Sequence, residues 1–150
     1  DICGGRGATD AVRTVNNNDG MDKTAEYRKR DFDGLCFVNL VDFDMLYGHR
    51  NDAVGHAKAL NEFSARLDDF ISKMRDDDVL FITADHGCDP STPSTDHSRE
   101  YVPLLVYGKR VKPVNLGTKT TYAYIAKTIC DMLGVENSLA GESLKSELLR

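Results

Sequence analysis

Apolar residues recur every three or four positions in two stretches of the chain. In residues 54–74 the apolar positions are Ala57, Leu60, Phe63, Leu67, Phe70, Ile71 and Met74. In residues 121–133 they are Tyr122, Ile125, Ala126, Ile129, Met132 and Leu133. Such spacing places the apolar side chains on one face of an α-helix. The pattern therefore predicts two amphipathic helices, and Gly134 is a suitable C-cap for the second.

Three short apolar runs have a different pattern, because their apolar residues are continuous. They are LCFVNLV at 35–41, VLFITA at 79–84 and VPLLVYG at 102–108. Runs of this length with β-branched residues predict buried strands, and Pro103 favours the start of the third strand or an edge position. Strands that alternate with helices and are apolar throughout predict an α/β fold, with a mostly parallel sheet flanked by helices.

The two ends of the chain are more polar. The segment NNNDG at 16–20 predicts a turn, followed by a short helix at 21–30, and the tail GESLKSELLR predicts one more short helix. No internal repeat or low-complexity linker interrupts the chain. Its 150 residues are enough for one domain with a hydrophobic core.

Composition narrows the classes of function. The chain has 19 Lys and Arg against 24 Asp and Glu, a net charge of −5 with no dense basic run, so it gives no indication of nucleic-acid binding. Its apolar runs are too short to cross a bilayer, so we expect no membrane partner. The four cysteines are widely spaced, which predicts reduced thiols and a cytoplasmic location.

Acidic and histidine residues gather where the predicted strands end or begin. The candidates are Asp42, Asp44, His49, Asp85, His86, Asp89, Asp96 and His97. Ligand sites of parallel sheets lie beyond the carboxyl ends of the strands, where loops distant in sequence converge. Carboxylate and imidazole without thiolate is the donor set of Zn²⁺, Mn²⁺ or Fe. Up to six of these residues could act as donors, which is more than one ion usually needs, whereas a pair of ions would use them and suits phosphoryl transfer.

Several of these residues have structural alternatives. The positions of Asp42 and Asp89, in polar loops after strands, favour a solvated or helix-capping role over metal binding. The pair at 85–86 could form a simple turn. His56 lies on the helix at 54–74, which favours a surface or packing role. Cys88 could be only a small side chain in the loop that holds most of the candidate ligands.

A longer motif adds a family resemblance. The segment TADHGCDPSTPSTDHSREYVPLLVY at 83–107 resembles the phosphopentomutase family of the alkaline phosphatase superfamily. A strand, then Asp-His-Gly, then a later His before the next strand is common to the superfamily, including cofactor-independent phosphoglycerate mutases. The fuller pattern DHG-x-DP-x-x-P-x-TDH-x-REYVPLL is the phosphopentomutase form. NNNDGMDKT, NLVDFDMLYGHRND, TYAYIAKTICDMLGV and GESL extend the likeness to essentially all 150 residues.

The resemblance implies specific roles. Asp85 and His86 would belong to one metal site, and the other would be formed by Asp44, His49 and His97. The two divalent ions would typically be Mn²⁺. Independently of the resemblance, the residues themselves leave two roles open for Arg99, a contact with phosphate or an ion pair with Glu100. The family moves a phosphate between C1 and C5 of ribose or deoxyribose through a phosphorylated enzyme threonine, so a pentose phosphate is the expected substrate.

The chain also departs from the family pattern. The phosphoacceptor Thr, a further Asp ligand and the cap domain of the family lie upstream of every segment matched here. Residues 1–150 are therefore expected to be the carboxyl-terminal portion of an alkaline-phosphatase-like core, inactive without the missing N-terminal part. Metal removal should destabilise it, because the carboxylates of Asp44 and Asp85 would repel each other. The alternatives are another phosphomutase or phosphatase on the same core, such as a phosphoglycerate mutase, or a non-catalytic metal-binding module.

Overall fold

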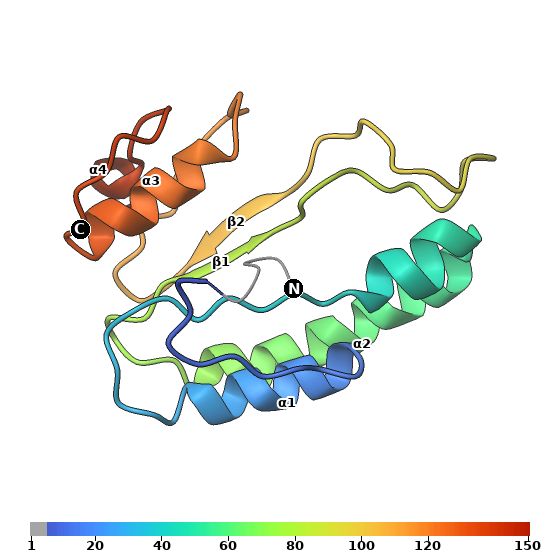
Figure 1. The fold of residues 1–150 in the computed structure, drawn as a ribbon, viewed down its shortest axis with the longest axis horizontal. Helices are drawn as coiled ribbons and strands as arrows, with labels where there is room; N and C mark the ends of the chain where they lie inside the picture. The colour runs from blue at the N-terminus through green and yellow to red at the C-terminus, as the bar shows by residue number, and fades with distance from the viewer. Residues whose placement is uncertain (1–5) are drawn as a thin grey trace.

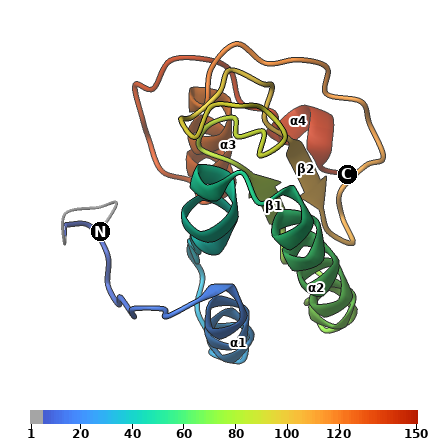
Figure 2. The ribbon, with the colours of Figure 1, turned by 90° about the vertical axis from the view of Figure 1, so that its right-hand side faces the viewer.

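A pair of strands lies between two groups of helices in the computed structural model, which describes residues 6–150 (Figures 1 and 2). On one side of the strands are α1 and α2, and on the other are α3 and α4. The elements in chain order are α1 (Asn17–Tyr27), the π-helical turn η1 (Phe43–Tyr47), the 3₁₀ turn η2 (Gly48–Arg50), α2 (Ala53–Ser72), β1 (Leu80–Thr83), β2 (Leu104–Tyr107), α3 (Ala123–Met132) and α4 (Lys145–Leu148).

Both amphipathic helices predicted from periodicity are confirmed as α2 and α3. The side chain of Asp52 caps α2 by accepting a hydrogen bond from the Gly55 amide at 2.8 Å. Gly134, just after α3, has a φ of 68°, the left-handed conformation that a glycine adopts readily at a helix end. No helix within residues 6–150 combines the length and apolar character needed to cross a bilayer.

The helix predicted at 21–30 starts earlier than expected. It begins at Asn17, because the side chain of Asn16 accepts a hydrogen bond from the Asp19 amide at 2.8 Å and so caps α1. The prediction of a separate turn at 16–20 is therefore wrong. The same Asn and Asp residues that favour turns also favour helix caps, and here they form the first turn of α1.

The predicted mostly parallel sheet is not confirmed. The sheet found in the described residues consists of β1 and β2 alone, and these strands are antiparallel, with Leu80 opposite Tyr107 and Thr83 opposite Leu104. Adjacent parallel strands require a crossover connection, usually a helix. The connection at 84–103 contains no helix and reverses the chain direction, so antiparallel pairing follows.

The prediction of a buried strand at 35–41 is wrong for this structure. It runs as an extended trace with no ladder to another strand in the described part of the chain (Figure 1). A strand is defined by hydrogen bonds to a neighbour, and an apolar sequence cannot supply that neighbour. Leu35 and Phe37 consequently remain 58% and 66% exposed.

The best-buried cluster lies where α3 meets α4 and confirms the predicted short helix in the tail. Leu144 and Leu148 are 1% exposed and Thr128 is fully buried. The hydroxyl of Thr128 donates to the Tyr124 carbonyl at 2.6 Å and accepts from the Leu144 amide at 2.8 Å. A single side chain therefore provides the hydrogen bond that the buried amide at the start of α4 requires.

A second polar contact joins the start of α1 to the turn η1. The Asn17 amide donates to the Asp42 carboxylate at 2.7 Å, and the Asp42 amide donates to the Asn17 side chain at 3.0 Å. The carboxylate lies at the N-terminus of a helix, where the macrodipole favours negative charge. Asp42 thus has the capping role that was one alternative for it, and it fixes the chain two residues before Asp44.

We expect Thr128→Val to lower the free energy of unfolding by about 1–3 kcal/mol, because the Leu144 amide loses its buried acceptor. Thr24→Val is the matched control. The Thr24 hydroxyl also donates to a carbonyl four residues earlier, at 2.7 Å from Gly20, but accepts no hydrogen bond in the described structure. Urea denaturation should show a clearly larger loss for Thr128→Val, and equal losses would contradict the role of Thr128.

We also expect Asn17→Ala to lower the free energy of unfolding by about 1 kcal/mol, because the Asp42 amide loses its acceptor. Asn18→Ala is the control, since the exposed Asn18 side chain accepts, among residues 6–150, only from Arg66, at 3.2 Å. If both variants unfold at the same urea concentration, the contact between α1 and η1 contributes nothing measurable.

Candidate metal centre

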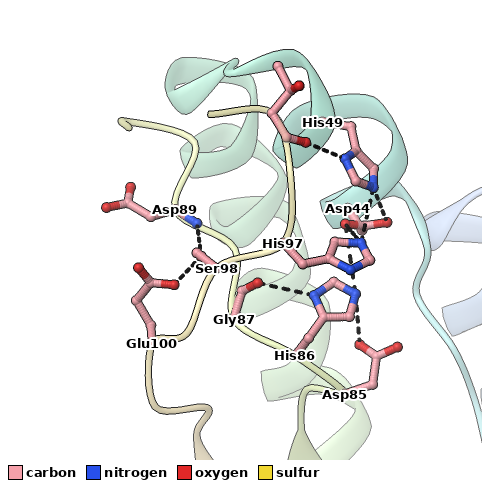
Figure 3. Close-up of polar contacts among 10 residues, drawn as sticks. Asp44, His49, Asp85, His86, Gly87, Asp89, His97, Ser98 and Glu100 are labelled. Carbon is pink, nitrogen blue, oxygen red and sulfur yellow. Dashed lines mark hydrogen bonds and ion pairs between the residues drawn. The ribbon is translucent and has the colours of Figure 1, made fainter. Parts of the chain in front are cut away.

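The antiparallel pairing of β1 and β2 brings two histidines together. The end of β1 lies beside the start of β2, and a further bridge between Gly87 and Ser98 continues the pairing beyond the strands, with the Ser98 amide donating to the Gly87 carbonyl at 3.0 Å. His86 and His97 flank this bridge. Their rings stack with centroids 3.6 Å apart and an interplanar angle of 18° (Figure 3).

The third contribution comes from the turns η1 and η2, which carry Asp44 and His49. Side chains five positions apart would point about 140° apart on a regular α-helix. Here the wider π-helical turn followed by the tighter 3₁₀ turn brings His49 Nε2 to 3.3 Å from Asp44 Oδ2. π-Helical turns occur frequently at functional sites, and no sequence pattern predicted this one.

Asp44 is the common neighbour of the three imidazoles. Its Oδ1 lies 3.6 Å from His97 Nε2 and 4.0 Å from His86 Nε2, in addition to the contact with His49. His97 Nε2 and His49 Nε2 are 3.1 Å apart. One donor atom from each of Asp44, His86 and His97 lies within 4.8 Å of the others, a spacing suited to a single cation between them.

Backbone carbonyls orient two of these rings. His49 Nδ1 lies 2.5 Å from the Thr95 carbonyl, and His86 Nδ1 lies 3.1 Å from the Gly87 carbonyl. A carbonyl oxygen only accepts hydrogen bonds, so each Nδ1 acts as the donor, and the other ring nitrogen, Nε2, faces Asp44. Metal-binding histidines are typically held in this way.

The residues present fit a divalent cation. Asp44 Oδ1 is buried and has no hydrogen-bond partner within the described residues. A carboxylate oxygen removed from water is costly unless it is hydrogen-bonded or faces a cation. With imidazole nitrogens on several sides, the donor set suits Zn²⁺, Mn²⁺ or Fe.

Asp85 lies at the edge of the same cluster. Its carboxylate oxygen is 3.6 Å from His86 Nε2, and its side chain is 81% exposed (Figure 3). His86 therefore lies between two carboxylates, those of Asp44 and Asp85. All five residues that the resemblance selected are brought together, whereas their division into two separate sites remains a prediction.

Two of the other candidates, Asp89 and His56, have structural contacts outside the cluster. The Asp89 carboxylate turns away from the histidines and accepts hydrogen bonds from the Ser91 hydroxyl at 2.6 Å and amide at 2.9 Å, which lower the pKa of Asp89 (Figure 3). His56 lies on α2, and its ring packs near that of Phe43, with centroids 5.5 Å apart. Arg99 is exposed. Asp89 and His56 thus occupy the structural roles that were their alternatives.

Two residues next to the ligands were not singled out for the site by sequence reasoning. Gly48 is buried within the η turns, directly before His49, and Cys88 lies two positions after His86. Burial raises the pKa of the Cys88 thiol, and the nearby Asp44 carboxylate raises it further. Their only signal in the sequence is proximity to the candidate ligands.

Comparisons with known proteins show which proteins the chain resembles. Residues 1–137 match the family model described as the metalloenzyme superfamily. The chain is 60% identical to a phosphopentomutase of Kosmotoga olearia and 59% identical to one of Acetivibrio thermocellus, each over 99% of this chain. It is 54% identical to a phosphopentomutase of Lachnoclostridium phytofermentans over all of this chain.

The extent of each match is also informative. The chain spans 39% of the length of each of these three relatives, so the similarity concerns one portion of a longer protein. The family model, in contrast, covers nearly the whole chain, including every residue of the clustered Asp and His side chains. The chain belongs to the metalloenzyme superfamily.

Proposed function

We propose that the full-length protein carrying this chain is a phosphopentomutase, which interconverts the 1-phosphate and 5-phosphate of ribose or deoxyribose through a phosphothreonine intermediate. The observation that carries the proposal is the convergence of Asp44 with three imidazoles. It occurs in a chain whose relatives, at 54–60% identity, are named phosphopentomutases. A non-catalytic metal-binding module would not require so close a likeness to one enzyme.

The proposed cofactors are two divalent ions, with Mn²⁺ as the expected metal. Asp85 and His86 would belong to one site, and Asp44, His49 and His97 to the other. The position of His86 between the two carboxylates supports neighbouring sites. Bound ions of this kind activate a nucleophile and stabilise charge on a transferring phosphate. The chain's own contribution is to hold the Nε2 atoms of His49 and His86 in place through the carbonyls of Thr95 and Gly87.

The remaining parts of the enzyme are proposed to lie outside this chain. In this proposal residues 1–150 are the carboxyl-terminal portion of an alkaline-phosphatase-like core and are inactive alone. The upstream part supplies the phosphoacceptor Thr, a further Asp ligand and a cap, and gives the run at 35–41 partners in a mostly parallel sheet. The exposure of Leu35 and Phe37 supports missing partners, as does the 39% coverage of the relatives.

Two further features belong to the proposal. The exposed Arg99, two positions after His97 in the sequence, would contact the phosphate of the substrate. A cytoplasmic location is supported by free thiols at Cys36, Cys88 and Cys130, the cysteines that the structure describes.

The direct test is an assay of the full-length protein with Mn²⁺. We expect interconversion of ribose 1-phosphate and ribose 5-phosphate, and no mutase activity on 3-phosphoglycerate. Asp44→Asn should reduce the pentose phosphate activity by at least about a hundredfold, because the carboxylate next to all three imidazoles is lost. Activity on phosphoglycerate alone would replace this proposal with the other mutase on the same core.

Metal binding can be measured separately from activity. Calorimetric titration of the metal-free full-length protein with Mn²⁺ should show two ions bound, and His97→Ala should bind one ion fewer because it removes a donor beside Asp44. His56→Ala is the matched control, since that ring packs on Phe43 outside the cluster. The melting temperature of the parent should rise with Mn²⁺, as binding to the folded state requires. If His97→Ala retains full binding, His97 is not a ligand.

A further inference from the structure

Position 48 requires a small residue because of a close contact with a neighbouring side chain, and not because of its backbone conformation. Gly48 has φ −61° and ψ −63°, right-handed helical values that any amino acid adopts without strain. A Cβ added there would overlap the Sγ of Cys88. The same carbon would lie tightly, at 3.3 Å, against the Phe43 carbonyl oxygen, and in ordinary contact, at 3.6 Å, with Asp44 Oδ1.

The two partners of this contact belong to different ligand segments. Gly48 lies in the η turns between Asp44 and His49, whereas Cys88 follows Asp85 and His86 in the loop after β1. The η turns contact the later part of that loop in other ways, through Thr95 as described above and through the Asn51 side chain, which donates to the Pro93 carbonyl at 3.3 Å. The contact between Gly48 and Cys88 links the η turns to the loop's first part, which carries His86.

We propose that Gly48 and Cys88 are positioning residues, whose close packing sets the distance between Asp44 and His86 and thereby the affinity of the centre for a divalent cation. Neither residue is a ligand in this role. Close backbone approach at Gly48 lets the η turns come near enough for Asp44 Oδ1 to lie 4.0 Å from His86 Nε2. A wider separation would pull apart the two neighbouring sites to which these donors are proposed to belong. This inference rests on the proposed metal centre.

A double-mutant cycle on Mn²⁺ affinity tests the proposal in the metal-free full-length protein. Gly48→Ala should weaken Mn²⁺ binding about tenfold or more, because residues that orient ligands typically affect metal affinity to this extent. Cys88→Ala should have a smaller effect, since it removes a packing atom without forcing the segments apart. The double variant should recover most of the lost affinity, because the added methyl group occupies the space that the sulfur atom vacates.

Two further variants exclude a general effect on folding. Gly34→Ala is the matched control, because a Cβ there would make only ordinary contacts with the Phe32 ring, at 3.6 Å and beyond, away from the centre. Cys88→Leu enlarges the other partner of the contact and should mimic Gly48→Ala. Circular dichroism of each metal-free variant reports folding, and recovery of folding in the double variant would also support the contact if Gly48→Ala alone unfolds.

Each outcome decides the question. Parent-like Mn²⁺ affinity in Gly48→Ala would overturn the proposal. So would a loss of affinity or folding in Gly48→Ala that the double variant, which adds Cys88→Ala, does not recover. Absence of Mn²⁺ binding by the parent protein would instead overturn the metal centre itself, and this role would be lost with it.

Discussion

The antiparallel pairing of β1 and β2 is the constraint on which the candidate metal centre depends. It fixes the end of one strand beside the start of the other, and the bridge between Gly87 and Ser98 extends that register into the loop. A shift of one residue would turn every side chain to the opposite face, so the stacking of His86 on His97 requires this register. The η turns then need only approach from one side to complete the cluster around Asp44.

The cluster is costly without a cation and well prepared for one. Within the described residues, the buried Asp44 Oδ1 has no hydrogen-bond partner and has imidazole Nε2 atoms nearby, an arrangement suited to a cation. The backbone carbonyls that orient His49 and His86 reduce the side-chain entropy that binding would otherwise remove. Cation binding would therefore couple to the ordering of three segments, which are the η turns and the two parts of the loop that carry His86 and His97. These segments share no helix or strand.

How much could be predicted from the sequence depends on the range of each interaction. The helices α2 and α3 were predictable because their apolar periodicity is local, and clustering of His49, His86 and His97 followed from their places beside apolar runs. The arrangement of the sheet was not predictable, because the pairing of a strand depends on a neighbouring strand that no single apolar run specifies. The run at 35–41 has no such neighbouring strand in the described chain. The π-helical turn and the contact of Gly48 with Cys88 are tertiary features without a sequence period, so only coordinates reveal them.

The distribution of buried surface separates a scaffold from a site. Where α3 meets α4, Leu144 and Leu148 are almost fully buried, and the hydrogen bonds of Thr128 close the cluster from within. Around the η turns the opposite holds, since Met45 and Leu46 remain 59% and 53% exposed. These apolar side chains lie next to Asp44 Oδ1, which has no hydrogen-bond partner within the described residues, so this region is less well packed than the cluster at α3 and α4. If the proposed cation and the proposed upstream part both bind here, their binding should be mutually reinforcing, because both contacts would be made within a few residues of Asp44.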